Sequence, residues 1–368
     1  MTKIALLKSR LHHRGGLEKY TLRLAAAFAD RGCEVTLLTT GPQFSHQSFE
    51  AISVAKDSKF SLAHVYRFKT RCEKWLRTHR YDAVFGMEAI SRPTHYRAGN
   101  GVHAVYLKQR RLTESPFKRA SFTINPFHNL LLQNEKKLFE NPELKQLFAN
   151  SKMVQREILD TYKTAAHKIC VVHNGVEWHE KQCDFEAGFH SVKKRPFELL
   201  FVGNDYQRKG LPFLLKGLAQ LPSYDFKLTV VGRDKKVDRY QKMAEKLKLE
   251  KKIRFMGSQS SLTPFYQSAD ALVIPSLYDP FANVTLEALA MGLFVISSPF
   301  NGGSEVLTET SGSIIEEPTS PDSVASSVKT SFQFPKSFER ARLIRNSIKE
   351  LDFSNQLDKI VQKTLDSC

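Results

Sequence analysis

Two acidic residues stand eight positions apart in the segment DPFANVTLEALAMGLFVIS, residues 279–297: Asp279 and Glu287. If a helix begins near residues 281–282, Asp279 lies in the loop before it and Glu287 about two turns inside it. Both carboxylates can then reach the same edge of a sheet, from different levels along the helix axis. A carboxylate can hold two adjacent hydroxyls, as acidic residues hold ribose in dinucleotide-binding folds.

The amides of the first turn of this helix form a second candidate element, because helix N-termini leave N–H groups free to bind an anion. We expect these amides at Asn283, Val284 and Thr285. The segment would then combine a sugar-hydroxyl clamp at Asp279, a phosphate seat and a ribose clamp at Glu287. These three elements correspond to the sugar, the phosphates and the ribose of a nucleotide sugar. The alternative is that both acids are ordinary capping and surface residues.

A second anion site is predicted in FVGNDYQRKG, where Gly203 and Asn204 end an apolar strand and Arg208 and Lys209 precede the next helix. Backbone N–H groups, the helix dipole and a guanidinium that grips two oxygens all favour phosphate. Gly232 in VVGRD repeats the strand-then-glycine arrangement and would let a ligand approach the backbone. The alternatives are a polar loop with a solvated cation pair and a common strand end.

The first half has two glycine-rich candidates of its own. The adjacent Gly15 and Gly16 in HHRGGLEKY offer a backbone surface that a diphosphate or a sugar can approach, although GxGxxG is absent. In RAGNGVHAVYLKQRR, Asn100 and His103 stand beside glycines, and His103 could donate a hydrogen bond to a sugar hydroxyl or a phosphate oxygen. A structural histidine is the alternative there.

Short apolar runs that alternate with amphipathic segments must position these residues. This is the rhythm of parallel sheets covered by helices on both faces. The predicted strands are 3–9, 34–40, 81–87, 168–176, 197–204, 226–234, 252–258, 271–276 and 293–298. We therefore expect an α/β fold of two Rossmann-like doubly wound parallel-sheet domains that face each other across a cleft, where ligands bind beyond the carboxyl ends of the strands.

The rhythm breaks once, and this break predicts the domain organisation. An acceptor-binding domain would span residues 1–176, a linker 177–196 and a nucleotide-sugar-binding domain 197–345. The terminal helical segment, 346–368, would cross back to the first domain. Residues 100–150 are expected to be irregular, basic and aromatic.

Composition excludes several classes of protein. The chain has 368 residues, of which 41% are hydrophobic, which is ample for two buried cores. No stretch approaches the ~18 apolar residues of a membrane span, and the N-terminus lacks a signal-peptide pattern, so we expect a cytosolic protein. The five cysteines are widely spaced and form no CxxC, which argues for reduced thiols and against zinc or disulfides.

The net charge of +17 is unevenly distributed. Residues 1–175 hold 29 Lys and Arg against 14 Asp and Glu, whereas the remainder holds 26 against 24. A basic first half predicts a polyanionic partner: nucleic acid, an anionic membrane surface or a phosphorylated acceptor. A merely basic, solvated surface is the alternative.

Eight motifs, in order and spacing along nearly the whole chain, resemble the retaining glycosyltransferases of family 4, which have the GT-B fold. The motifs are GGLEKY, ANSKMVQREI, VVHNGV, FVGNDYQRKG, VVGRD, FMGS, ADALVIPS and DPFANVTLEALAMGLFVI. Within that family, RAGNGVHAVYL and FVGNDYQRKG are most similar to the lipopolysaccharide core glucosyltransferase I group.

The resemblance implies roles for single residues. Arg208 and Lys209 would hold the donor diphosphate, and Glu287 would bind the donor ribose as the second acid of an E-x7-E motif. Asp279 stands where the family has the first Glu, which contacts hydroxyls of the transferred sugar, so its carboxylate is set back by about one methylene. The glycine pair 15–16 would lie near the diphosphate and the reacting sugar.

Catalysis has fewer clear candidates. Asn100 stands where some relatives have Asp, so a base role would shift to His103 or to the substrate itself. Arg208, Lys209 and the helix N-terminus could stabilise the leaving diphosphate. No DxD-like cluster is present, and no metal ion or other cofactor is required. We favour front-face attack, with a leaving phosphate oxygen taking the acceptor proton.

The expected function is transfer of a hexose, with glucose from UDP-glucose as the first choice, to a lipopolysaccharide-core or other phosphorylated, lipid-linked acceptor. The enzyme would work at the inner face of the cytoplasmic membrane, and the basic, aromatic segment 104–128 would dock on the anionic surface. Three alternatives stay open: a GDP- or ADP-linked sugar such as heptose, a sugar-nucleotide epimerase, and a non-enzymatic nucleic-acid-binding protein. No recognised nucleic-acid module is present, so we expect no nucleic-acid partner.

Overall fold

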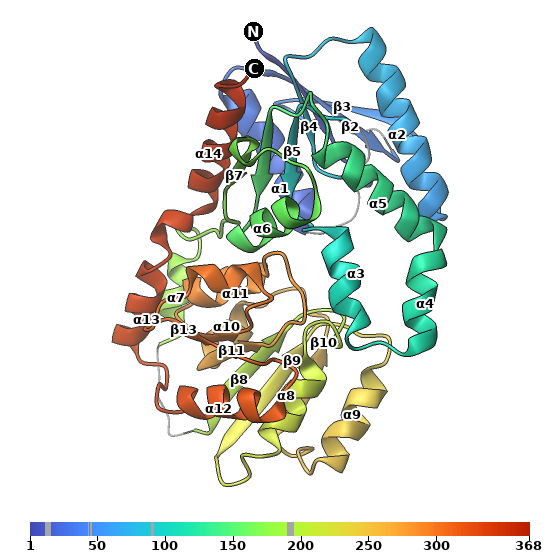
Figure 1. Ribbon diagram of the computed structural model, residues 1–368. Helices are drawn as coiled ribbons and strands as arrows, with labels where there is room; N and C mark the ends of the chain where they lie inside the picture. The colour runs from blue at the N-terminus through green and yellow to red at the C-terminus, as the bar shows by residue number, and fades with distance from the viewer. Residues whose placement is uncertain (12–15, 43, 45, 90–91, 190–194) are drawn as a thin grey trace. The chain divides into compact units, whose positions relative to one another are not determined.

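The computed structural model describes residues 1–11, 16–42, 44, 46–89, 92–189 and 195–368. The chain divides into two compact units (Figure 1). The first unit contains Met1–His173 and also Gln356–Cys368. The second unit contains Asn174–Asn355. Each unit is an α/β domain with its own parallel sheet, and this confirms the expected fold class.

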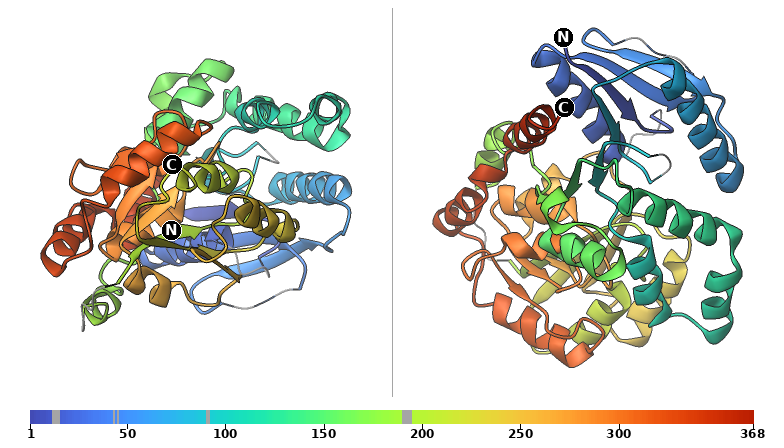
Figure 2. Two further views of the ribbon diagram at one scale, coloured as in Figure 1. Left: turned by 90° about the horizontal axis from the view of Figure 1, so that it is seen from below. Right: turned by 45° about the horizontal axis from the view of Figure 1, so that its top comes forward.

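The first unit is built on a seven-stranded parallel sheet in the order β3-β2-β1-β4-β5-β6-β7. The blue strands of this sheet lie side by side at the top of the right-hand view of Figure 2. Its strands are β1 (Lys3–Leu7), β2 (Glu34–Thr40), β3 (Glu50–Ala55), β4 (Ala83–Gly86), β5 (His95–Ala98), β6 (Gln146–Ala149) and β7 (Ile169–Val171). The chain order reverses between β1 and β4, which is the switch point where doubly wound folds bind ligands.

Helices of the first unit pack on this sheet and on one another. They are α1 (Gly16–Asp30), α2 (Ser61–Thr78), α3 (His103–Arg111), α4 (Pro116–Ile124), α5 (Pro126–Phe139), α6 (Lys152–Thr161), the short η1 (Ala166–Lys168) and most of α14 (Phe353–Leu365). Helix α6 is capped at its N-terminus, because the Ser151 side chain accepts a hydrogen bond of 3.1 Å from the amide of Val154.

The second unit is built on a six-stranded parallel sheet in the order β10-β9-β8-β11-β12-β13. Its strands are β8 (Phe197–Val202), β9 (Phe226–Val231), β10 (Ile253–Gly257), β11 (Ala271–Ile274), β12 (Phe294–Ser297) and β13 (Gly312–Ile314). Its helices are α7 (Gln182–Ala187), α8 (Leu211–Leu218), α9 (Val237–Lys246), α10 (Thr263–Ser268), α11 (Asn283–Ala290), η2 (Gly302–Val306), α12 (Pro321–Ser331), α13 (Phe338–Asn346) and η3 (Lys349–Leu351).

Burial on both faces explains the unbroken apolar run of β8. Leu199 and Phe201 belong to the core cluster that includes residues of α8 and α9. Leu200 and Val202, which point to the opposite face, belong to the cluster that includes residues of α11. Each face thus has its own apolar core, as a parallel sheet between helix layers requires.

Two segments differ from the sequence-based expectation. The segment expected to link the domains, 177–196, contains α7, and Phe185 of that helix is buried in the core of the second unit. The segment expected to be irregular, 100–150, forms three successive helices, and α3 and α4 both pack on α5. Basic and aromatic residues on the outer faces of these short helices hide the usual apolar period.

Side chains of α14 and of the residues after it contact the rest of the first unit. The guanidinium of Arg31, just after α1, lies 3.0 Å from a carboxylate oxygen of Asp358. His95 Nε2 and Ser367 Oγ form a hydrogen bond of 2.9 Å, and His95 is completely buried. The C-terminal helix is therefore part of the first unit's packing, although the chain reaches it only after the second unit.

Candidate active site

A buried ion-pair cluster lies at the carboxyl ends of β8 and β11 in the second unit. Lys209 Nζ is 2.5 Å from Asp279 Oδ2, and Arg208 Nη1 is 3.0 Å from the same oxygen. Arg208 also donates a hydrogen bond of 2.9 Å to the carbonyl of Tyr278. Two cations predicted to bind phosphate and one acid predicted to bind a sugar thus meet at a single point.

Burial and charge act against each other in this cluster. Burial would raise the pKa of Asp279, but the charges of Lys209 and Arg208 outweigh it and hold this pKa below its ordinary value. Burial lowers the pKa of Lys209, and the attraction of Asp279 only partly offsets that effect. Asp279 therefore remains a carboxylate at neutral pH, and one negative charge is shared by two cations.

The two predicted glycines of this site are closely packed, and Gly232 leaves no room for a side chain. A Cβ atom on Gly232, whose φ is +127°, would lie 2.1 Å from the carbonyl oxygen of Gly203. A Cβ atom on Gly203 would lie 3.0 to 3.3 Å from the Lys209 side chain. The space at Gly203 is thus occupied by the stem of the lysine, so this glycine lets Lys209 reach Asp279. Asn204 closes the loop, because its Oδ1 accepts a hydrogen bond of 2.9 Å from the amide of Arg233.

Glu287 lies on α11, and its side chain is hydrogen-bonded to a buried tyrosine. The hydroxyl of Tyr266, on α10, donates a hydrogen bond of 2.8 Å to Glu287 Oε2. Tyr266 is 1% exposed, whereas Glu287 is partly exposed. Lys336 supports the end of α10, because its Nζ donates to the carbonyls of Tyr266 at 3.0 Å and Gln267 at 3.3 Å. One carboxylate oxygen is therefore fixed by the core.

Helix α11 begins at Asn283, one or two residues later than expected. The amide of Thr285 already donates to the carbonyl of Ala282 at 2.9 Å, and its buried hydroxyl accepts a hydrogen bond from Asn301. Within the predicted phosphate seat, the amides of Asn283 and Val284 are thus better placed than that of Thr285. Asn301 also fixes the start of the helix, because its Oδ1 accepts the amide of Ala282 at 3.0 Å.

The candidate site residues of the first unit are less closely grouped than those of the second unit. Gly15 lies outside the described residues, and Gly16 is the first residue of α1. Asn100 is exposed in the turn after β5, and His103 is the first residue of α3. The Nε2 atom of His103 lies 3.0 Å from Nδ1 of His128, so this imidazole already has one polar partner.

A buried carboxylate fixes the N-terminus of α3. Glu135, on α5, accepts hydrogen bonds from the amide of His103 at 2.6 Å and from the hydroxyl of Tyr162 at 2.8 Å. Burial raises the pKa of Glu135 to about 7, and these hydrogen bonds only partly oppose it. Burial, with His128 as a smaller cause, lowers the pKa of His103 to about 4. The His103 ring is therefore neutral at physiological pH.

Sequence reasoning missed the residues that support the site from behind, chiefly Tyr266, Asn301 and Glu135. Each is a buried polar residue within or beside an apolar segment, and such a pattern is equally typical of a satisfied core residue. No signal in a single sequence pairs Tyr266 with Glu287.

Neither a metal cluster nor a membrane span is found in the part of the chain that the structure describes. No three His, Cys, Asp or Glu side chains among these residues gather closely enough to hold a metal ion. No helix among them is both long and apolar enough to cross a membrane.

Two family models match the chain, one for each half. Residues 14–179 match "Glycosyltransferase Family 4", and residues 184–350 match "Glycosyl transferases group 1". Together the two models cover most of the chain.

Similar proteins come from bacteria and archaea. The lipopolysaccharide glucosyltransferase WaaG of Escherichia coli is 24% identical over 330 residues, which are 84% of this chain and 83% of WaaG. An uncharacterized glycosyltransferase of Methanocaldococcus jannaschii is 30% identical over 192 residues, and this match spans about half of each chain, 49% in both cases. The O-antigen chain mannosyltransferase RfbU of Salmonella typhimurium is 28% identical over 57% of each chain.

Solved structures agree in fold over the whole chain. The crystal structure of WaaG, a glycosyltransferase involved in lipopolysaccharide biosynthesis, superposes with a TM-score of 0.79 at 22% identity and covers 98% of this chain and 99% of its own. Anabaena HepE, solved in complex with UDP and glucose, has a TM-score of 0.71 at 16% identity with both chains fully covered. With its two parallel-sheet units and both family models matched, the chain belongs to the GT-B glycosyltransferases, with a family 4 region in its first half and a group 1 region in its second.

Proposed function

We propose that the chain is a retaining, metal-independent hexosyltransferase that takes glucose from UDP-glucose and transfers it to a lipopolysaccharide-core or other phosphorylated glycolipid acceptor. The observation that carries this proposal is the cluster of Arg208 and Lys209 on Asp279, eight residues before Glu287. Two relatives support the choice of donor, because WaaG is named a lipopolysaccharide glucosyltransferase and HepE binds UDP and glucose.

The donor would bind along the carboxyl edge of the second sheet. Its diphosphate would lie on Arg208 and Lys209 and on the amides of Asn283 and Val284, where helix-terminal N–H groups favour anions. Glu287, with one oxygen held by Tyr266, would accept hydrogen bonds from the ribose hydroxyls. In this arrangement Asp279 shares its two cations with the diphosphate and keeps Oδ1 for a hydroxyl of the sugar.

The same groups would drive the chemistry. Breaking the bond between the sugar and the diphosphate builds negative charge on the leaving oxygen, and fixed cations beside that oxygen stabilise the transition state. Arg208 and Lys209 would supply this charge in place of a metal ion. The acceptor attacks from the face that the diphosphate leaves, and a leaving phosphate oxygen takes its proton. The configuration at the sugar's anomeric carbon is then retained.

The first unit would bind the acceptor at an anionic membrane surface on the cytosolic side. It carries nearly all of the excess positive charge. Three large apolar side chains of the α3–α4 region are strongly exposed: Leu112 at 68%, Phe117 at 91% and Ile124 at 78%. Exposed apolar side chains beside Lys and Arg are typical of surfaces that dock on anionic lipid.

Donor binding and transfer should be measured over a panel of UDP-, GDP- and ADP-linked sugars, with Lys209→Ala and Glu287→Ala as site variants. Thermal stabilisation by UDP, with transfer from UDP-glucose that both variants lose, is the expected result. Stabilisation by GDP or ADP alone would move the proposal to another donor, such as a heptose. Consumption of the donor without an acceptor would favour an epimerase. Thermal stabilisation only by an oligonucleotide would refute the proposal that the protein is an enzyme.

Product stereochemistry tests the mechanism separately. Proton NMR of the product at the earliest turnover should give the anomeric configuration of the donor. An inverted product would contradict both retention and front-face attack.

A further inference from the structure

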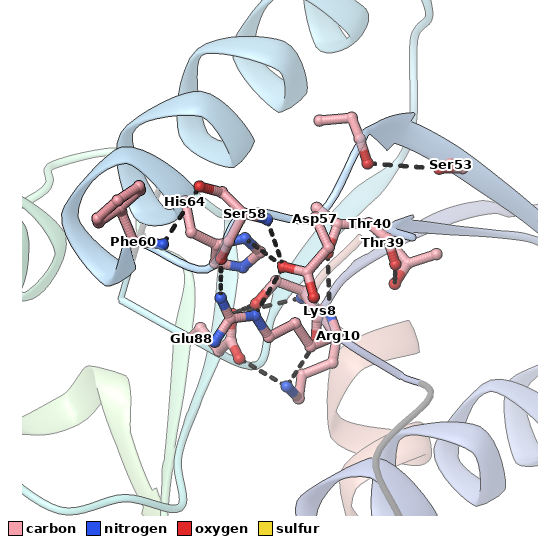
Figure 3. A network of polar contacts seen from close by, with 12 residues as sticks. Lys8, Arg10, Thr39, Thr40, Ser53, Asp57, Ser58, Phe60, His64 and Glu88 are labelled. Atoms are coloured by element: carbon pink, nitrogen blue, oxygen red, sulfur yellow. Dashed lines mark hydrogen bonds and ion pairs between the residues drawn. The ribbon is translucent and has the colours of Figure 1, made fainter. Parts of the chain in front are cut away.

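The carboxyl edge of the first sheet carries a charged network that none of the roles above uses (Figure 3). Lys8 directly follows β1, and its Nζ lies 2.6 Å from an oxygen of Glu88 and 3.5 Å from one of Glu18. Lys8 also donates to the carbonyl of Ser9 at 2.6 Å. The Lys8 side chain is 4% exposed, whereas that of Glu88 is 22% exposed. Lys8 is therefore a buried cation that holds two carboxylates at the surface.

Glu88 is held at both of its oxygens but retains capacity for a ligand. Oε1 accepts from Lys8, and Oε2 accepts from the hydroxyl of Ser9 at 2.7 Å and from its amide at 3.3 Å. A carboxylate oxygen can accept two hydrogen bonds. Oε1 thus has a fixed position and can accept one more donor.

Arg10 extends the network to the loop after β3. Its φ of +51° is left-handed, which is uncommon for a residue other than glycine. The conformation is supported by a bond of 3.1 Å from its amide to Thr40 Oγ1 and by an ion pair of 2.9 Å between its Nε and Asp57 Oδ1. Backbone strain held by contacts on both sides is concentrated at functional sites.

His64, on α2, supplies a buried polar atom with no hydrogen-bond partner in the part of the chain that the structure describes. Its Nδ1 lies 3.0 Å from Asp57 Oδ1, and the ring is 5% exposed. Its Nε2 is buried and has no hydrogen-bond partner among the described residues. The charges of Arg10, Asp57, Glu88 and Lys8 all act on this imidazole, so the ring belongs to the same cluster. An orphaned buried nitrogen is rare and indicates a missing donor or acceptor.

The charge balance of the cluster identifies the chemical class of its ligand. Among the described residues of the cluster, three carboxylates, from Glu18, Asp57 and Glu88, face two cations, Lys8 and Arg10, and every one of these groups is ion-paired. The excess of negative charge disfavours binding of a free phosphate. The carboxylates already pair with lysine and arginine, which disfavours a metal ion. A hydroxyl suits the site, because a hydroxyl donates to a carboxylate and accepts from an N–H group.

We propose that Glu18, Asp57, His64 and Glu88, positioned by Lys8 and Arg10, form a subsite for the hydroxyl groups of the acceptor saccharide. The site lies at the β1–β4 switch point of the first sheet, where ligands of doubly wound folds bind. The inference rests on the proposed transferase function and deepens it. The neutral sugar ring of the acceptor is bound here, and its phosphates are bound by the basic surface.

Saturation-transfer NMR with a deacylated, dephosphorylated lipopolysaccharide core oligosaccharide tests the subsite directly. The full chain is used, with UDP present. Glu88→Gln and Glu18→Gln remove one carboxylate each and keep the side-chain volume. Each is expected to weaken oligosaccharide binding at least about 10-fold, since hydrogen bonds to charged groups are the strong ones. The matched control is Glu143→Gln, which makes the same change at an exposed position of the first unit.

Three readouts keep the outcomes separate. UDP affinity, measured on the same samples, is expected to be unchanged in both variants, and failure of the wild-type chain to bind UDP would refute the proposed function instead. Inorganic phosphate is expected not to compete with the oligosaccharide. Absence of an oligosaccharide signal in a wild-type chain that binds UDP, affinity equal to that of the control in both variants, or competition by phosphate would overturn the subsite.

Discussion

Lys209 Nζ and Asp279 Oδ2 lie 2.5 Å apart in the second unit, although 70 residues separate them in the chain. Both side chains are nearly buried, with 9% and 11% of their surface exposed. A buried ion pair of this kind is expensive to break, because removal of one partner leaves the other charge buried with less compensation.

Lys209→Ala should therefore lower the free energy of unfolding by about 3 kcal/mol. The double variant Lys209→Ala, Asp279→Ala should lose less than the sum of the two single variants, because the residues interact directly. Urea denaturation followed by circular dichroism measures all three. Strict additivity would show that the two groups are not coupled.

Tyr266→Phe should raise the KM for the nucleotide sugar about 10-fold and leave kcat nearly unchanged. The change removes the hydroxyl that fixes Glu287 Oε2, and a hydrogen bond to a charged group contributes about 1.5 to 3 kcal/mol. Steady-state kinetics with varied donor gives both constants. A fall in kcat with an unchanged KM would contradict a role in ribose binding, and a matching melting curve would exclude simple misfolding.

Gly232→Ala should destabilise the second unit strongly, by about 3 kcal/mol or more, because the new methyl group meets the Gly203 carbonyl at 2.1 Å. Gly257→Ala is the matched control, since Gly257 also has a positive φ of +65° but nothing within 4 Å of its would-be Cβ. The control should cost only the left-handed strain, about 1 kcal/mol. Equal melting temperatures for the two variants would refute the close-packing explanation of Gly232.

Glu135 should make stability depend on pH. Its folded pKa, about 7, lies above the ordinary value of 4.5, so the folded state binds the proton more tightly than the unfolded state does. The resulting stabilisation is complete below pH 4.5 and is lost as the pH rises towards 7. Glu135→Gln should remove this part of the pH profile in urea denaturation, and Glu143→Gln should keep it. An unchanged profile in Glu135→Gln would contradict the raised pKa.

Much of the fold could be predicted from the sequence because apolar runs and glycine-ended strands are local signals. The apolar run at Leu199–Val202 depends on nearby residues only, and the strand predicted there is confirmed. The three helices between residues 100 and 150 could not be predicted, because their short lengths and charged outer faces blur the apolar period. Phe185 packs into a core that is built from distant strands, so composition alone suggested a linker.

The candidate site could be predicted from the sequence to a similar extent as the fold. The acids and cations stand at strand ends and helix starts, which sequence patterns locate well. Their mutual pairing was not predictable, because a contact between Lys209 and Asp279 depends on the order of β8 and β11 in the sheet. Asp279 was expected to face a sugar, and in the structure its Oδ2 is already bound to both cations.

Membrane docking by the α3–α4 region should depend on both lipid charge and apolar contact. Phe117→Ser with Ile124→Ser should reduce co-sedimentation with anionic phosphatidylglycerol vesicles about 10-fold or more, since each side chain contributes about 1.5 to 3 kcal/mol when buried. Leu343→Ser, at a 62% exposed position of the second unit, is the control and should bind like wild type. Equal binding of the wild-type chain to neutral phosphatidylcholine vesicles would contradict the electrostatic part of the proposal.

Binding of a nucleoside diphosphate by the second unit should depend on fixed protein cations and not on a metal ion. Calorimetric titration of UDP in the presence of EDTA measures this dependence, with wild type, Lys209→Ala and, as a control, Lys216→Ala at an exposed position of α8. Wild type and the control are expected to bind UDP equally without a divalent ion, and Lys209→Ala is expected to bind at least about 10-fold more weakly. Equal affinity of Lys209→Ala and wild type, or binding of UDP only when a divalent ion is added, would contradict it.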